Sequence, residues 1–259
     1  MATILDEIRA HKEIELAERQ ARRPLREVEA SCIGLPATRG LRRVLSQPGM
    51  QILAAVKRRS PAKGDLKLGA NAPELAETYF AGGAAGVSVL TDERFFSGAD
   101  QDLTDVRSRV VGPLLRKDFT ISDYQIFEAR ALGADAVLLI ASLLTDQQLR
   151  EYLATAARLS LDALVETHTT EEVARALDAG ATLIGVNNRN LANFTVDLAT
   201  TEQLAPLVPS GVILVSESGI MSRADVERVE RAGAHAVLVG EALVTAPDPA
   251  EKIRELLGL

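Results

Sequence analysis

The chain has 259 residues, 47% of them hydrophobic, which is enough to bury a large core in one barrel or in two small domains. A formal net charge of −7 and a sequence pI of about 5.2 argue against an extended basic face, so we expect no nucleic-acid partner. No apolar run approaches the roughly 20 residues that cross a bilayer, and the N-terminus MATILDEIRAHK lacks the apolar centre of a signal peptide; we therefore expect no membrane partner and a cytoplasmic location.

The first 47 residues carry a helical pattern. Apolar side chains such as Ile4, Leu5 and Ile8 recur among many charges, and a second segment begins at the proline of RRPLREVEA. We interpret residues 1–47 as a helical N-terminal extension, and we expect its helices to pack near the mouth of the domain that follows.

The first strand is expected at Ile52–Lys57, where an apolar run without alternation stops abruptly at a lysine. Such a run is typical of a parallel strand that is covered on both faces, and Pro61 and Gly64 mark the next stretch as a loop. Lys57 is therefore a candidate for an active-site lysine. The alternative is a surface lysine whose flexible stem carries its ammonium to water.

After the first strand, short apolar runs alternate with longer amphipathic segments, which is typical of β-α units around a parallel sheet. Glycine-containing turns of the kind AGGA and RAGA precede every second strand at intervals of about 50 residues, where a helix can end in a left-handed turn. This regular period favours a closed TIM (β/α)8 barrel, a single domain over residues 1–259, rather than an open doubly wound sheet, and no G-x-G-x-x-G follows the first strand. The eight expected strands are Ile52–Lys57, Gly86–Leu90, Pro113–Lys117, Ala136–Ala141, Asp162–Glu166, Thr182–Asn187, Val212–Glu217 and Ala236–Gly240.

Polar residues end most of these strands, and in a TIM barrel the carboxyl ends of the strands form the active site. They are Lys57, Lys117-Asp118, Glu166, Asn187-Asn188-Arg189, Glu217-Ser218-Gly219 and Gly240-Glu241. Two lysines and a glutamate at one mouth suit acid–base catalysis, because each lysine is expected to depress the other's pKa and to donate a proton that the carboxylate can accept.

Gly219 and Gly240 follow the seventh and eighth strands, where many barrels bind phosphate through backbone N–H groups. We therefore expect a phosphorylated small-molecule substrate, with the Glu241 N–H facing the phosphate and its carboxylate pointing away. The alternative is that both glycines serve only tight turns.

No metal or redox site is expected. The only cysteine, Cys32, excludes an internal disulfide. The three histidines, His11, His168 and His235, show no metal-ligand spacing.

Eight stretches together resemble the indole-3-glycerol phosphate synthase family, and the resemblance covers nearly the whole chain. The LLRKDF and IGVNNRNL pair is the most specific, whereas LVGEAL is shared with other phosphate-binding barrels. The stretches are KRRSPAKG at 57–64, SVLTDERFFSGA at 88–99, LLRKDF at 114–119, YQIFEARALGAD at 124–135, LVETH at 164–168, IGVNNRNL at 184–191, SESGI at 216–220 and LVGEAL at 238–243.

The resemblance implies a cofactor-independent monomeric lyase that converts 1-(2-carboxyphenylamino)-1-deoxyribulose 5-phosphate to indole-3-glycerol phosphate in tryptophan biosynthesis. It assigns Lys117 as the general acid, Lys57 as a second acid and anion contact, and Glu166 as the carboxylate that accepts a proton or stabilises positive charge. The remaining implied contacts are Ser60, Asn187, Arg189, Glu217 and Ser218 with substrate, and Gly219, Gly240 and Glu241 with phosphate. Phe95, Phe96 and Phe119 could enclose the aromatic ring or could pack in the core.

One position departs from the family pattern. Where the family has glutamate two residues before the first-strand lysine, as in A-E-I-K, this chain has Ala55. Strand alternation places positions 55 and 57 on the same face, so the absent carboxylate would lie beside the Lys57 ammonium. Two readings remain open: an active synthase, or a barrel of this family, natural or engineered, that binds the phosphorylated ligand with little turnover.

Overall fold

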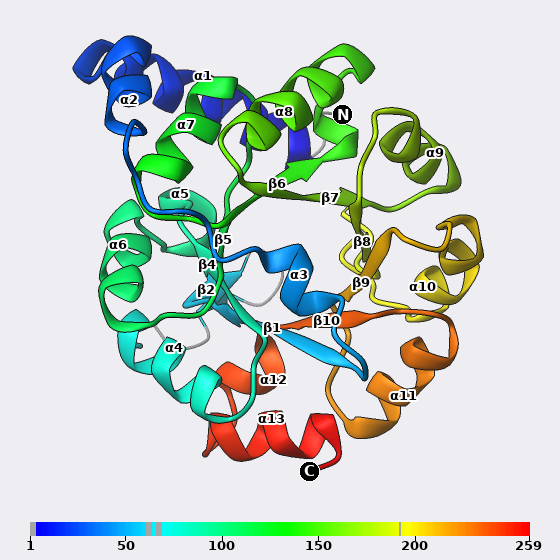
Figure 1. The fold of residues 1–259 in the computed structure, drawn as a ribbon. Helices are drawn as coiled ribbons and strands as arrows, with labels where there is room; N and C mark the ends of the chain where they lie inside the picture. Colours follow the sequence, from blue (N-terminus) through cyan, green and yellow to red (C-terminus); the bar gives the residue numbers. More distant parts are fainter. Residues whose placement is uncertain (1–3, 61–63, 66–68, 192) are drawn as a thin grey trace.

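A computed structural model shows a closed barrel of eight parallel strands surrounded by helices (Figure 1), which confirms the predicted TIM barrel. The structure describes residues 4–60, 64–65, 69–191 and 193–259. Strands adjacent in the barrel order β1-β10-β9-β8-β7-β6-β5-β4 pair in parallel, and β10 closes the barrel by pairing with β1. The strands are β1 Gln51–Val56, β4 Gly86–Leu90, β5 Leu114–Lys117, β6 Ala136–Ile140, β7 Asp162–Thr167, β8 Leu183–Asn187, β9 Ile213–Glu217 and β10 Ala236–Val239.

Helices cover the outside of the barrel (Figure 1). Several begin at a side-chain cap; Ser122, Thr145 and Ser222 each form a capping box with the third residue of the helix. None of the described helices is long and apolar enough to cross a membrane. The helices after β1 are α4 Ala72–Ala81, α5 Glu93–Phe96, α6 Asp100–Arg109, α7 Asp123–Ala131, α8 Asp146–Arg158, α9 Thr170–Asp178, α10 Ala199–Leu204, α11 Arg223–Arg231, α12 Glu241–Val244 and α13 Pro249–Leu257, with 3₁₀ turns at Ala141–Leu143 and Ala205–Leu207.

The repeated glycines end helices as predicted. Gly83, Gly133, Gly180 and Gly233 have φ angles of 102°, 90°, 91° and 107°, in the left-handed region that glycine adopts at little cost. Each turn reverses the chain from an outer helix into the next strand. The repeat therefore marks the returns into β4, β6, β8 and β10.

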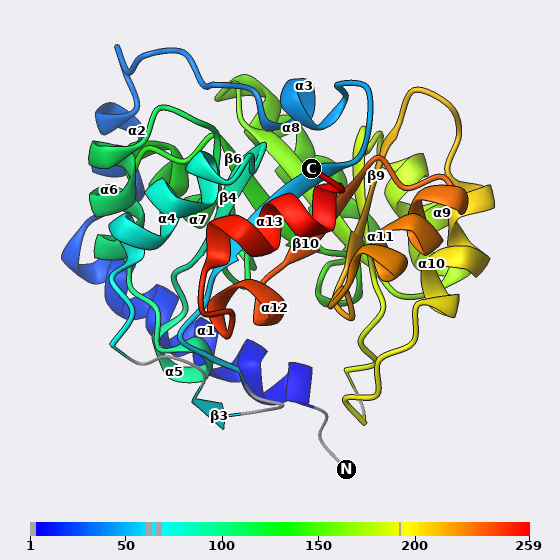
Figure 2. The same ribbon diagram turned by 90° about the horizontal axis from the view of Figure 1, so that it is seen from below.

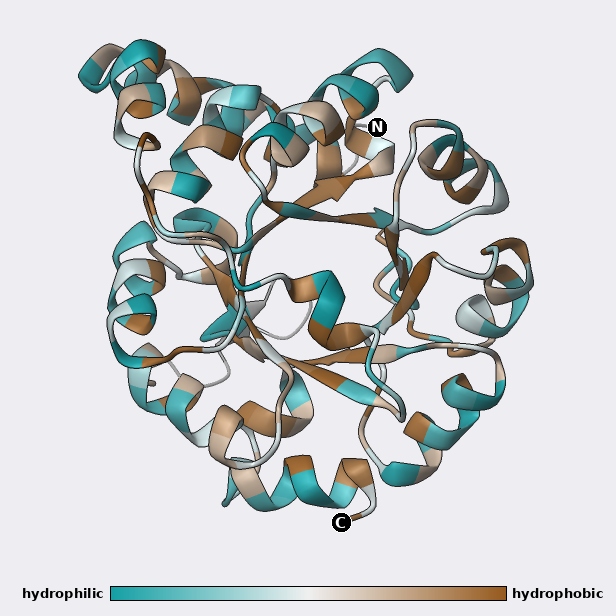
Figure 3. Ribbon diagram, in the orientation of Figure 1, coloured by the Kyte–Doolittle hydropathy of each residue, from teal (hydrophilic) through white to brown (hydrophobic). Residues whose placement is uncertain are grey.

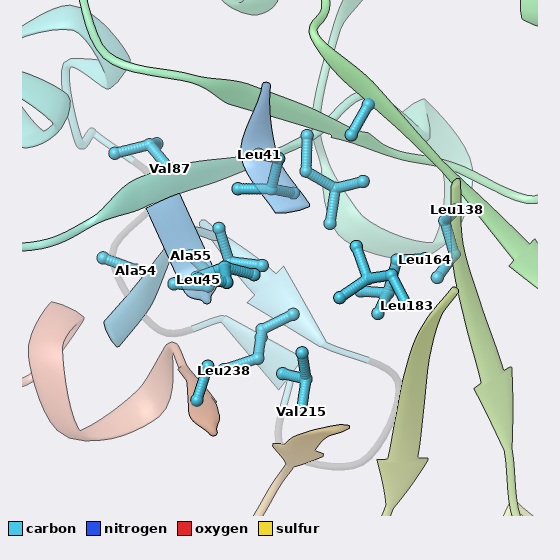
Figure 4. Close-up of a cluster of buried hydrophobic side chains, with 14 of the residues drawn as sticks. Leu41, Leu45, Ala54, Ala55, Val87, Leu138, Leu164, Leu183, Val215 and Leu238 are labelled. Atoms are coloured by element: carbon cyan, nitrogen blue, oxygen red, sulfur yellow. The ribbon is translucent and has the colours of Figure 1, made fainter. Parts of the chain in front are cut away.

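The strands are covered on both faces, which explains why their sequences show no alternation between apolar and polar residues. All five residues of β4, β6 and β9 are buried. Strand ribbons are mostly apolar in Figure 3, whereas the outer helices alternate between apolar and polar residues. Apolar side chains from four different strands pack together inside the barrel in Figure 4, namely Leu138, Leu164, Val215 and Leu238. This apolar layer lies below the polar residues at the carboxyl ends of the strands.

The N-terminal extension forms three helices, α1 Ile4–Arg22, α2 Leu25–Ser31 and α3 Leu41–Leu45. The expectation that they pack near the mouth holds for α1, whose first turns line the cavity described below. It is wrong for α3, which lies at the opposite end of the barrel (Figure 2), where the Arg42 N–H donates to the carboxylate of Asp162 in the first residue of β7 at 2.8 Å. Leu41 and Leu45 of α3 plug that end with apolar side chains, as Figure 4 shows.

A short hairpin follows β1. Its strands β2 Arg59–Ser60 and β3 Gly64–Asp65 pair antiparallel. Of the predicted basic loop 57–64, residues 57–60 and 64 are described and lie beyond the carboxyl end of β1, and residues 61–63 lie outside the described part of the structure. The side chain of Ser60 lies outside the described part of the structure, so its expected contact with substrate stays a prediction.

Candidate active site

A cavity of about 540 Å³ opens at the carboxyl ends of the strands. Its wall combines strand-end polar groups with apolar side chains from α1 and the loops. The structure brings together there, from six strands and the turns after them, the sequence-predicted residues Lys57, Lys117, Phe119, Glu166, Asn187, Arg189, Glu217, Ser218, Gly219, Gly240 and Glu241. Ala55 also lines this cavity.

The Lys117 ammonium at the end of β5 lies between two carboxylates. Its Nζ donates to Glu166 Oε2 on β7 at 3.0 Å and to Glu217 Oε2 on β9 at 2.8 Å. Both carboxylates are buried. Glycine at position 185 on β8 leaves room for this arrangement, because a Cβ there would lie 2.1 Å from Glu217 Oε1.

The two carboxylates hold Lys117 in its charged form. Burial alone would lower the pKa of Lys117, but the charges of Glu166 and Glu217 outweigh burial and raise the pKa above its usual value. The expectation that two lysines depress each other's pKa is therefore wrong for Lys117. Its nearest charges are carboxylates, so it is a fully protonated donor at neutral pH.

The two carboxylates differ in proton affinity. Burial raises the pKa of Glu217, the Lys117 ammonium opposes that rise, and repulsion from Glu166 adds to it; the net shift is upward. Burial also acts on Glu166, but Lys117, His168 and the hydrogen bond from Asn187 outweigh it, so its pKa is lowered. Among the described residues, Glu217 Oε1 has no hydrogen-bond partner. Such a divided pair offers one group that takes up a proton readily and one that stays ionised.

His168 supports Glu166, and the sequence analysis did not single it out. Its Nε2 lies 3.5 Å from Glu166 Oε1, and its Nδ1 lies 3.2 Å from Glu172 Oε2. Burial alone would lower the pKa of His168, but the hydrogen bond to Glu172 and the charges of Glu166, Glu172 and Glu217 raise it overall. A signal was present: His168 stands two residues after Glu166, which puts both on one side of the strand end.

Asn187 continues this network around the mouth. Its Nδ2 donates to Glu166 Oε1 at 3.0 Å, and its Oδ1 accepts the backbone N–H of Arg189 at 3.0 Å. Asn187 thus fixes a carboxylate and a turn at once. The neighbouring Asn188 donates to the Ser218 carbonyl oxygen at 3.0 Å and ties the end of β8 to the turn after β9.

The end of the cavity near β1 and β10 is shaped by close approaches. An ideal Cβ at Gly240 would lie 3.3 Å from the Ala55 Cβ and 3.8 Å from Lys57 Nζ, so the lysine head lies beside the Gly240 backbone. Gly219 has φ 86°, and a Cβ there would lie 2.7 Å from Val196 Cγ1. Gly240 therefore leaves backbone accessible next to an ammonium, an arrangement that suits an anion, and Gly219 lines the same cavity.

An apolar wall faces these polar groups. Phe96 and Phe119 line the cavity with ring centroids 6.0 Å apart, and Ile4, Leu5 and Ile8 of α1 complete this side. Phe95 does not line the cavity; its ring packs edge-on against Phe119 with centroids 6.3 Å apart. Of the three phenylalanines, two therefore face the cavity and Phe95 belongs to the core.

Comparison with known proteins settles the family. The family model described as indole-3-glycerol phosphate synthase matches residues 5–256. The chain belongs to this family. It is 46% identical to an indole-3-glycerol phosphate synthase from Nocardioides sp. over 257 residues, covering 99% of each chain. It is 47% identical to one from Kineococcus radiotolerans over 260 residues, covering 98% of this chain and 95% of that protein.

Solved structures of lower identity share the fold alone. Thiamine phosphate pyrophosphorylase from Pyrococcus furiosus superposes with a TM-score of 0.61 at 17% identity, covering 80% of this chain and 93% of that one. A 3-hexulose-6-phosphate synthase gives a TM-score of 0.61 at 19% identity, covering 81% of this chain and 99% of that one.

Ala55 is the position where the sequence of this member of the indole-3-glycerol phosphate synthase family was expected to depart from the family pattern. The side chain lies in the cavity wall and is 2% exposed. It stands level with Ser88 on the neighbouring β4, and the buried Ser88 hydroxyl has no hydrogen-bond partner among the residues the structure describes. A small apolar group thus stands level with a buried hydroxyl and near the lysine head beside Gly240, and both of these groups can donate to an acceptor.

Proposed function

We propose that this chain catalyses the conversion of 1-(2-carboxyphenylamino)-1-deoxyribulose 5-phosphate to indole-3-glycerol phosphate, with loss of carbon dioxide and water. The observation that carries the proposal is the Lys117 ammonium held between Glu166 and Glu217 at the base of a partly apolar cavity. Family membership over nearly the whole chain supports the same reaction.

The cavity suits a substrate with an aromatic ring at one end and a phosphate at the other. The phosphate is assigned to the end where Lys57 lies beside Gly240, and Gly219 and the Glu241 backbone, which line the same cavity, are assigned as further phosphate contacts. The ring is assigned to the wall that includes Phe96 and Phe119. Arg189 is assigned to the ring carboxylate, because a guanidinium pairs well with a planar carboxylate.

Ring closure needs an acid at the carbonyl oxygen. The ring carbon that bears the carboxylate attacks the ketone carbon, a carbon–carbon bond forms, and Lys117 gives its proton to the carbonyl oxygen. The positive charge that develops on the ring and its nitrogen is stabilised by the ionised Glu166. Loss of carbon dioxide leaves the bonding electron pair in the ring and restores its aromaticity.

Dehydration completes the reaction. The new hydroxyl group leaves as water when it is protonated, and a carboxylate accepts a proton from the neighbouring ring carbon, which forms the indole double bond. Glu217, whose pKa is raised, is assigned as the acid of this step, and Glu166, whose pKa is lowered, as the proton acceptor. The two carboxylates share Lys117, so a proton can be returned to it between steps.

A second candidate function is supported by Ala55. Without the carboxylate that the family pattern places there, the chain would bind the phosphorylated ligand and turn it over slowly or not at all. The two candidates differ in rate and share the same binding site.

The deciding experiment incubates the purified chain with the carboxyphenylamino-deoxyribulose phosphate and follows indole fluorescence. If the chain is a synthase, indole fluorescence increases steadily with time, and the Lys117→Ala substitution abolishes this increase. Binding without any growth in fluorescence above that of Lys117→Ala would support the second candidate.

A further inference from the structure

A buried ammonium lies next to the proposed catalytic site, on the N-terminal extension. Lys12 of α1 is 1% exposed, and its Nζ lies 2.7 Å from Asp118 Oδ1, 2.9 Å from Asp92 Oδ2 and 2.9 Å from Glu15 Oε2. Lysine is almost never fully buried unless it is paired. The partners come from three places: the end of β5, the turn after β4, and α1 itself.

The contact with Asp118 reaches the proposed general acid directly. Asp118 follows Lys117 in the chain, and its carboxylate also accepts the backbone N–H of Phe119 at 2.8 Å and the hydroxyl of Thr91 at 2.6 Å. Anchoring Asp118 therefore anchors the backbone on both sides of it. Lys117 and Phe119 both line the cavity.

The contact with Asp92 reaches the aromatic wall. Asp92 caps α5 by accepting the Phe95 N–H at 2.6 Å, and the next residue of α5, Phe96, lines the cavity. On α1, Ile4, Ile8 and Lys12 follow each other at four-residue intervals and so share one helix face. The same ammonium therefore holds α1 with its apolar residues over the mouth.

The contacts of Asp118 and Asp92 depend on the positive charge of Lys12. The pKa of Asp118 is lowered, because the charges of Lys12 and Arg116 outweigh the effect of burial, whereas burial raises the pKa of Asp92. Without the Lys12 ammonium, two buried carboxylates from adjacent strand ends would face each other and repel. The end of β5 would then shift or take up a proton.

We propose that Lys12 is a positioning residue for the ring-closure reaction, holding Lys117 in line with its two carboxylates and holding α1 against the substrate ring. This inference rests on the proposed function. A misplacement of about 1 Å can cost about 10²-fold in rate, so loss of the Lys12 contacts should appear in turnover more than in phosphate binding.

The test compares Lys12→Met with the charge-compensated double variant Lys12→Met/Asp92→Asn, in which asparagine retains the helix cap. Lys252→Met is the control, because Lys252 pairs with Glu255 at 2.7 Å on the outer helix α13. The chain has six lysines, so labelling with [¹³Cε]lysine gives a small set of NMR signals, and Lys117→Ala assigns the one of interest.

The expected result is a fall in kcat of about 10-fold or more in both Lys12 variants, with a shifted Lys117 signal and an affinity for inorganic phosphate within about twofold of the parent. Lys252→Met should match the parent in kcat, in phosphate affinity and in the Lys117 signal. A folded double variant with parental kcat and an unmoved Lys117 signal would overturn the inference. Failure of the double variant to fold would also overturn it, since the cluster would then maintain the fold and not the site.

The inference and the proposed function can fail separately. If the parent chain shows no turnover, the proposed function fails, and the Lys117 signal still reports whether Lys12 positions that ammonium. If the parent turns over normally and the Lys12 variants do too, only the inference fails.

Discussion

Introducing a carboxylate at position 55 should raise turnover. An ideal Cβ at Gly240 would lie 3.3 Å from the Ala55 Cβ and 3.8 Å from Lys57 Nζ. The Ala55 Cβ and Lys57 Nζ are therefore at most about 7 Å apart. A glutamate side chain at position 55 can close most of that distance. Its second oxygen would face Ser88 on β4, whose buried hydroxyl lacks a partner among the described residues. We expect Ala55→Glu to increase kcat by about 10²-fold, the lower end of what a general base contributes.

The expected gain in rate can be compared with the free-energy cost of burying a new carboxylate. A hundredfold gain in rate corresponds to about 2.7 kcal/mol off the barrier. A carboxylate about 4 Å from the Lys57 ammonium gains about 4 kcal/mol of attraction at an effective dielectric constant of 20. Desolvation of the new charge offsets much of that attraction. We therefore expect the free energy of unfolding of Ala55→Glu to stay within about 2 kcal/mol of the parent, so the gain in rate should be measurable on folded protein.

The assay is turnover of the parent, Ala55→Glu and Ala55→Gln under the same conditions, followed by indole fluorescence. Ala55→Gln is the matched control, because it adds the same volume without a charge. A gain confined to Ala55→Glu supports the reasoning. An unchanged or lower rate for Ala55→Glu would show that the missing carboxylate does not limit this chain and that its acid–base chemistry is complete with Glu166 and Glu217.

Three further predictions follow from the site. Lys117→Ala should lower kcat by about 10²- to 10⁴-fold and leave the affinity for phosphate-bearing ligands largely intact, which steady-state kinetics and a binding titration can check; a raised KM with unchanged kcat would make Lys117 a binding residue. Inorganic phosphate or product should raise the melting temperature of the parent, and Gly219→Ala should reduce that shift, because a Cβ there would lie 2.7 Å from Val196 Cγ1; no shift at ligand concentrations well above about 10⁻³ M would count against a phosphate site. The pKa of His168 is raised on folding, so its stabilising contribution is complete below the unfolded pKa near 6.5 and is lost as pH rises through the folded pKa. The free energy of unfolding lost in His168→Gln, measured by denaturant unfolding, should therefore be larger at pH 5.5 than at pH 9. Equal losses at both pH values would refute the assignment.

The barrel could be predicted from the sequence because its signals are local. Buried parallel strands read as short apolar runs, and the helix ends are marked by glycines such as Gly83 and Gly233, which adopt the left-handed turn. Parallel strands also place their carboxyl ends together, so Lys57, Lys117 and Glu166 could be assigned to one mouth before any distance was known.

Other features depend on distances that a sequence does not contain. The pKa of Lys117 was expected to be lowered by a second lysine. The barrel instead places Lys117 between two carboxylates, which raise its pKa. Lys12 lies in a helix rich in charges, where the pattern suggests a solvated side chain; its burial depends on carboxylates about 80 and 106 residues away in the chain. From its sequence, the short amphipathic α3 could cover either end of the barrel. The hydrogen bond from the Arg42 N–H to Asp162 at the start of β7 places it at the amino-terminal end of the strands.

The proposal that this chain closes the indole ring is tested most directly with substrate labelled with ¹³C in its carboxylate group. The parent chain should release ¹³CO₂ and form the fluorescent indole product in equal amounts, and Lys117→Ala should form both at least about 10²-fold more slowly. Substrate that binds to the parent chain without releasing ¹³CO₂ or forming indole would contradict the proposed reaction.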